Sequence, residues 1–137
     1  MDNIIGQQID VYRIEARLGA GGMGAVYRAY DAGLARRVAL KVMHAQFASQ
    51  PQFQRRFMQE AQAVARLTHP SIVVIHRFDN KQGYLYIVME YVNGLSLGAY
   101  IKQLAQRNQV MLLTETAHII AQVADALGYA HRQGVVH

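Results

Sequence analysis

The sequence predicts an α+β fold in which a strand-rich first part is followed by a helical last part. Segments with the pattern of strands fill most of the first 92 residues and are interrupted by one helix. From residue 93 onward, apolar residues recur with helical spacing instead. A chain that separates its strands from its helices in this way is typical of α+β proteins. We expect a boundary near Val92 to Gly94, which divides the chain into domains 1–92 and 93–137.

Three strands are predicted before residue 44. In the first, apolar side chains alternate with polar ones, at Tyr12, Ile14, Ala16 and Leu18. The second covers residues 25–31 and the third residues 37–43, with turn-forming residues between them. The glycine-rich segment 18–24 therefore joins two strands rather than a strand and a helix.

A helix of about four turns is predicted between Pro51 and Pro70, because proline is favoured at the start of a helix and also ends one. One apolar stripe along this helix is formed by Phe53, Phe57, Ala61, Val64 and Leu67. Two further strands, 71–78 and 84–92, are predicted around the turn-prone segment 79–83.

The last part of the chain contains two predicted helices, residues 93–109 and 114–134. Ser96 and Thr114 are predicted to cap their first turns, because a hydroxyl can accept a free backbone N–H. Gly134 is predicted to end the second helix.

Composition excludes several classes of protein. The 14 Lys and Arg residues outnumber the 9 Asp and Glu residues, but they are scattered, which indicates a solvated surface rather than a nucleic-acid interface. The chain has no cysteine, so it has neither disulfides nor thiolate metal sites, and we expect a cytoplasmic location. No segment resembles a signal peptide or a membrane span. The six histidines do not have metal-ligand spacing, so no metal site is predicted.

The glycines at 19, 21, 22 and 24 are compatible with more than one kind of loop. A dinucleotide-binding loop requires a helix after its last glycine, where this sequence predicts a strand. A Walker A loop requires Lys followed by Ser or Thr, where this sequence has Ala25 and Val26. A flexible hairpin remains one alternative. The other is a strand-loop-strand flap whose backbone amides approach phosphate, followed by Val26 to pack on a base.

Two charged residues lie on elements that are otherwise apolar. Lys41 is flanked by apolar residues in a predicted strand, and Glu60 lies within the apolar stripe of the helix. An unpaired charge in the core would be costly, so we expect the two side chains to point into the core and pair with each other. A purely structural ion pair is the alternative to a pair that positions phosphates.

Five segments resemble those of bacterial eukaryotic-type serine/threonine protein kinases, in the same order and spacing. They are LGAGGMGAVYRAYD, VALK, EAQAVARLTHPSIV, YIVMEYVNGLSL and ALGYAHRQGVVH, and the resemblance extends from about Tyr12 to His137. It implies a five-stranded antiparallel sheet with one helix, a hinge, and a partial helical lobe. It also implies the transfer of the γ-phosphate of Mg²⁺-bound ATP to protein serine or threonine.

The resemblance further implies a role for individual residues. The phosphate loop would comprise Leu18, Gly19, Ala20, Gly21, Gly22, Met23 and Gly24. Lys41 would hold the phosphates and Glu60 would hold Lys41. Val26, Ala39 and Leu97 would contact adenine, Met89 would lie at the back of the pocket, and the backbone of Glu90 and Val92 would bind the adenine edge. Ser96 occupies the position of an acidic ribose-binding residue in many kinases.

His137 corresponds to the histidine of the family's His-Arg-Asp motif. The catalytic aspartate and the ligands of Mg²⁺ would follow it, so we expect these 137 residues alone to be inactive. An apolar stripe on the last helix, Ile119, Ile120, Val123 and Leu127, would then favour self-association or a kinase partner. The alternative function is a non-catalytic module that binds nucleotide or a partner kinase. The sequence indicates no particular protein substrate.

Overall fold

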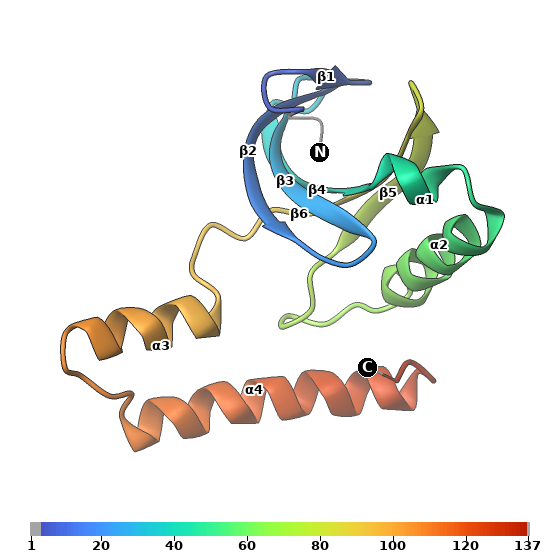
Figure 1. The fold of residues 1–137 in the computed structure, drawn as a ribbon. Coiled ribbons are helices and arrows are strands. Elements are labelled where there is room, and N and C mark those ends of the chain that lie inside the picture. The colour runs from blue at the N-terminus through green and yellow to red at the C-terminus, as the bar shows by residue number, and fades with distance from the viewer. Residues whose placement is uncertain (1–3, 137) are drawn as a thin grey trace. The chain divides into compact units, whose positions relative to one another are not determined.

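The computed structural model describes residues 4–136, which form two compact units (Figure 1). The first contains the residues up to Thr68 together with Val73–Tyr91, and the second contains His69–Ile72 and the residues from Val92 onward. The first unit holds β1 (Gln8–Ile9), β2 (Tyr12–Ala20), β3 (Gly24–Asp31), β4 (Arg36–Met43), α1 (Ala45–Ala48), α2 (Pro51–Ala65), β5 (Ile75–Lys81) and β6 (Tyr84–Glu90). The second holds α3 (Leu97–Gln106) and α4 (Leu113–Arg132).

The strands of the first unit form one antiparallel sheet in the order β1-β2-β3-β4-β6-β5. The expected architecture is confirmed, but the sheet has six strands rather than five. The additional strand is β1, which pairs with the start of β2 after a tight turn in which Asp10 has a positive φ of 54°. Two residues are too few to produce a recognisable alternation, so the sequence pattern did not reveal this strand.

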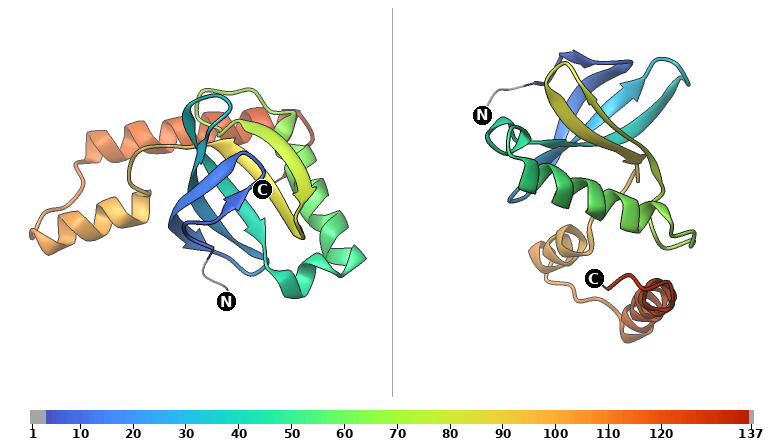
Figure 2. Two further views of the ribbon diagram at one scale, coloured as in Figure 1. Left: turned by 90° about the horizontal axis from the view of Figure 1, so that it is seen from above. Right: turned by 90° about the vertical axis from the view of Figure 1, so that its right-hand side faces the viewer.

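The sheet has an apolar cluster on each face. One cluster is built from residues of β1 to β4 and β6, among which Ile9, Ile14, Leu40 and Tyr86 are almost completely buried. The other cluster contains Phe57 and Ala61 of α2, together with Met43, Leu85 and Ile87 of the sheet. The helix packs against the sheet through this second cluster, and both views in Figure 2 show α2 alongside the sheet.

Several predicted boundaries are wrong by a few residues. The predicted strand 71–78 is observed at Ile75–Lys81, so the turn shrinks to Gln82 and Gly83, both with positive φ. Helix α2 ends at Ala65, and Leu67 is buried beyond its end rather than along its stripe. The short helix α1 was not predicted, because four residues cannot display a helical period.

In the second unit, Ser96 caps α3 as predicted, since its Oγ accepts a hydrogen bond of 3.1 Å from the Ala99 N–H. Thr114 does not cap α4, whose N-cap position is Leu112. Gly134 follows the end of α4 with a φ of 78°, which a glycine adopts without strain. None of the helices between residues 4 and 136 has the length and apolarity that crossing a membrane requires.

The segment His69–Ile72 is joined to α4 by His69. The imidazole Nδ1 of His69 accepts the Ser71 N–H at 3.0 Å, and its Nε2 lies 2.8 Å from Asp125 Oδ2. Because Nδ1 accepts a hydrogen bond, Nε2 is the ring nitrogen that donates one to the Asp125 carboxylate. The ring also lies 5.4 Å from the ring of Tyr129, centroid to centroid.

Candidate functional site

The strand register places the predicted site residues of the first unit on one face of the sheet. Val26 of β3 lies opposite Lys41 of β4, which lies opposite Ile87 of β6. In the next row, Ala39 lies opposite Met89. Directly paired residues share a face, as do residues two apart in a strand. The sheet therefore brings Val26, Ala39, Lys41 and Met89 together.

Helix α2 adds an acidic side chain to this face. Its buried residues Phe57 and Ala61 fix it against the sheet, and Glu60 lies between them in the sequence. Lys41 Nζ donates a hydrogen bond of 3.2 Å to Glu60 Oε1. The ammonium also lies 5.6 Å from the centre of the Phe57 ring, at a distance where cation–π attraction operates. The predicted pairing of Lys41 with Glu60 is confirmed.

The expectation that both charges point into the core is wrong for Glu60. The side chain of Glu60 is 49% exposed and that of Lys41 is 25% exposed. Glu60 lies at the edge of the apolar stripe of α2, so its carboxylate remains accessible to water. A solvated pair contributes little stability by itself, because water screens the attraction and the two side chains lose conformational freedom. The small gain in stability therefore does not explain why Lys41 and Glu60 are paired.

The glycine-rich segment forms the hairpin between β2 and β3. Strand β2 includes Leu18, Gly19 and Ala20, and β3 begins at Gly24, so the tip is Gly21, Gly22 and Met23. The Gly21 N–H donates a hydrogen bond of 2.8 Å to the Gly24 carbonyl and closes the turn. The predicted strand-loop-strand arrangement is thus observed.

The glycines of this hairpin differ in what surrounds them. A Cβ atom at Gly24 would overlap the backbone carbonyl of Val42, so the packing of β3 on β4 requires glycine there. A Cβ atom at Gly19 or Gly22 would meet no atom within 4 Å. Packing within the chain therefore accounts for Gly24, whereas Gly19 and Gly22 leave open space beside the backbone.

A charged network crosses the sheet near the end of β6, and sequence reasoning missed it. Glu15 Oε2 accepts hydrogen bonds from Arg37 Nε at 3.0 Å and from Arg28 Nε at 2.9 Å. These two guanidinium groups, Arg37 foremost, hold the pKa of Glu15 below its usual value. Hydrogen bonding to Tyr91 and to Glu15 raises the pKa of Arg28. The network thus connects β2, β3 and β4 to Tyr91, the residue that follows β6.

Glu90 itself is held by Val74, the residue before β5. Its N–H donates to the Val74 carbonyl at 2.8 Å, and its carboxylate accepts the Val74 N–H at 3.2 Å. Val92 and Leu97 belong to the second unit, where they are 62% and 43% exposed. Leu97 is the first residue of α3. Between residues 4 and 136, no cluster of three or more His, Asp or Glu side chains is arranged to hold a metal ion.

Comparison with known proteins identifies the relatives of the chain. Residues 12–137 match the family described as protein kinase domain. The chain is 43% identical to the serine/threonine-protein kinase PknJ of Mycobacterium tuberculosis over 126 residues, covering 92% of the chain and 20% of PknJ. It is 38% identical to the serine/threonine-protein kinase PrkC of Bacillus subtilis over 135 residues, covering 98% of the chain and 20% of PrkC. The chain thus spans about a fifth of the length of these two relatives.

A solved structure has the same fold. The crystal structure of the Mycobacterium tuberculosis PknI kinase domain superposes with a TM-score of 0.75 at 34% identity. The match covers 97% of this chain and 53% of that one.

Proposed function

The chain belongs to the protein kinase family, among bacterial serine/threonine protein kinases, and we propose that its first unit is the ATP-binding part of such an enzyme. The observation that carries the proposal is the hydrogen bond between Lys41 and Glu60 on the face that also bears Val26, Ala39 and Met89. The pair is too exposed to serve mainly as a stabilising contact. An accessible ammonium held by a carboxylate is instead suited to bind the α- and β-phosphates of ATP.

The glycine-rich hairpin completes the proposed phosphate site. The space beside Gly19 and Gly22 lets a phosphate oxygen approach the backbone amides more closely than any side chain would allow. Val26 and Ala39 would then pack on adenine, with Met89 at the back of the site. The backbone of Glu90 would bind the adenine edge. Mg²⁺ would neutralise charge on the phosphates during transfer.

Mg-ATP binding tests this proposal directly. We expect Lys41→Ala to weaken Mg-ATP binding by roughly 10- to 100-fold, the usual value of a charge-assisted hydrogen bond. Isothermal titration calorimetry on the purified chain measures the change. Lys102→Ala removes an exposed lysine from α3 and is the matched control, for which the affinity should stay unchanged. Equal affinities for the Lys41→Ala variant and the unaltered chain would refute the assignment.

We also propose that the 137 residues bind nucleotide without transferring phosphate. The aspartate that accepts the substrate proton and the magnesium-binding residues of the family have no counterpart among these 137 residues. Incubation of the purified chain with γ-labelled Mg-ATP and a generic protein substrate should therefore leave the substrate unlabelled. Labelling that disappears in the Lys41→Ala variant would contradict this expectation.

A further inference from the structure

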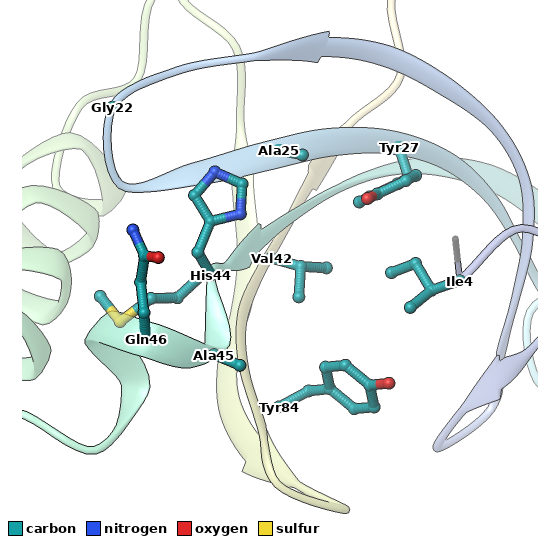
Figure 3. A pocket seen from close by; sticks show the side chains of 10 residues that line it. Ile4, Gly22, Ala25, Tyr27, Val42, His44, Ala45, Gln46 and Tyr84 are labelled. Carbon is teal, nitrogen blue, oxygen red and sulfur yellow. The ribbon is translucent and has the colours of Figure 1, made fainter. Parts of the chain in front are cut away.

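A cavity of about 410 Å³ lies in the first unit, at one end of the apolar cluster formed by β1 to β4 and β6. Figure 3 shows the side chains of Ala25, Tyr27, Val42 and Tyr84 around this space, with Ile4 on one side and His44 on the other. Cavities of this size accommodate small molecules. No step of the proposed kinase chemistry uses this one.

The cavity lies across the sheet from the proposed ATP site. Ala25 and Tyr27 flank Val26 in β3, and Val42 follows Lys41 in β4. Successive side chains of a strand point to opposite faces, so these lining residues face away from Val26 and Lys41. A ligand that packs on these residues would therefore lie across the sheet from adenine, and Gly22 is the one lining residue within the described range 4–136 that also belongs to the proposed nucleotide site.

The curl of the sheet around this cavity is closed by polar contacts between the two hairpins at its edges. Lys81 Nζ donates to Asp10 Oδ2 at 3.1 Å, and the Asp10 N–H donates to Gln82 Oε1 at 3.2 Å. Tyr84 also donates to Gln7 through its hydroxyl, at 3.4 Å. These contacts tie the turn between β1 and β2 to the hairpin of β5 and β6. The cavity thus lies within a curled sheet whose two edges are in contact, an arrangement similar to the mouth of a β-barrel, where ligands commonly bind.

One wall of the cavity is continuous with the glycine-rich hairpin. Gly22 lines the cavity, and its neighbour Met23 accepts a hydrogen bond of 3.0 Å from the His44 N–H through its carbonyl. The imidazole of His44 lines the same space. A ligand that contacts His44 would consequently restrict the tip of the hairpin.

The lining of the cavity indicates the chemistry of a ligand. Its apolar lining includes Ala25, Val42 and the rings of Tyr27 and Tyr84. The side chains of His44 and Gln46 provide groups that both donate and accept hydrogen bonds. Among the residues that the structure describes, the lining contains no Asp, Glu, Lys or Arg. A charged ligand would have no counter-ion here. We propose that this cavity binds a neutral, flat aromatic compound with one hydrogen-bonding group, and that binding restrains the glycine-rich hairpin.

Titration with 2-naphthol, a neutral aromatic alcohol, tests this site in the 137-residue chain without nucleotide. We expect saturable changes in the amide NMR signals of Ala25, Val42 and Ala45. Ala45→Trp places an indole at the lining and should weaken binding by about tenfold or more. Ala65→Trp adds the same ring at an exposed position of α2 outside the cavity and should leave the affinity unchanged.

The outcomes that overturn the proposal are equally specific. A second apolar surface lies between α3 and α4, lined by Leu97, Ile101 and Ile120 among others. Signal changes confined to those residues, or equal weakening by both tryptophan variants, would mean unspecific partitioning. If Ala45→Trp does not fold, His44→Ala should reduce the affinity in its place, and unchanged binding there would also refute the site.

A separate measurement tests whether binding in the cavity restrains the glycine-rich hairpin. Bound 2-naphthol should slow the amide hydrogen exchange of Gly22 and Met23, and an unchanged exchange rate would overturn the coupling. Only the relevance of this coupling to ATP rests on the proposed function. If the chain binds 2-naphthol but not Mg-ATP, the proposed function fails and the second site stands.

Discussion

At the scale of single residues, the glycines of the β2–β3 hairpin have different physical surroundings. Gly24 packs against the Val42 carbonyl so closely that any side chain would collide with backbone atoms. Gly19 and Gly22 have no such neighbour. A sequence motif that looks uniform therefore combines one position required by packing with others that the surrounding atoms leave unconstrained.

This difference predicts that replacing glycine with alanine affects the free energy of unfolding strongly at Gly24 and hardly at Gly22. Gly24→Ala should lower the free energy of unfolding by about 1–3 kcal/mol, because the new methyl group forces β3 and β4 apart. Gly22→Ala should change the free energy by less than about 0.5 kcal/mol, as expected for an open surface position. Urea unfolding followed by circular dichroism measures both. Equal losses in the two variants would show that packing on Val42 does not distinguish them.

At the scale of elements, the sheet is joined across β2, β3 and β4 by the carboxylate of Glu15. One carboxylate accepts from two guanidinium groups on neighbouring strands, Arg28 and Arg37. Such cross-strand charge pairs stabilise a particular register. Here the network also reaches Tyr91 and thereby connects the sheet to the end of β6.

The lowered pKa of Glu15 predicts a pH-dependent contribution to stability. The folded chain holds this carboxyl ionised below its ordinary pKa of 4.5, so its stabilising effect is present above that pH. The effect is lost as the pH falls through the lower, folded value. The difference in Tm between the unaltered chain and Glu15→Gln should therefore be constant near neutral pH and shrink in acid. A difference that stays constant down to the acid limit of folding would contradict this interpretation.

At the scale of the whole molecule, the helical unit exposes an unpartnered apolar stripe. Ile120 is 57% exposed, Val123 is 47% exposed and Leu127 is 37% exposed, all on α4. Each large apolar side chain left in water forgoes about 1.5–3 kcal/mol of burial. A surface of this kind favours association with another protein surface.

We therefore expect the isolated chain to self-associate through α4. Sedimentation velocity should show an average mass that rises with protein concentration. Replacing Ile120 and Val123 with lysine should restore the monomer, whereas lysines at the exposed Ala121 and Ala124 of the same helix should not. A monomer at every concentration in the unaltered chain would rule this expectation out.

The candidate site could be predicted from the sequence to the level of which residues meet. Lys41 and Glu60 each carry a charge on an apolar element, and the pairing inferred from that conflict is observed. The exposure of Glu60 was predicted incorrectly, because a helical period states which stripe a residue belongs to but not how far the stripe is covered. The assignment of these residues to ATP, and of 1–92 and 93–137 to separate domains, stays a prediction.

The Glu15 network and the cavity were not predictable in the same way. The network depends on which residues of β2, β3 and β4 lie opposite one another, and β2 changes register twice through irregularities near Ala16 and Gly19. The alternation along one strand does not state such shifts, because they depend on how that strand pairs with its neighbour. The cavity likewise depends on side-chain contacts between hairpins more than 70 residues apart in the sequence.

The sequence by itself determined the kinds of elements, their order and the chemical groups that each contributes, because apolar periodicity and glycine or proline positions act over a few residues. Only the tertiary structure decided the sixth strand, the strand register, the exposure of Glu60 and the position of the cavity. These features arise from contacts between distant segments, and their geometry depends on how the sheet curls and how α2 packs on it.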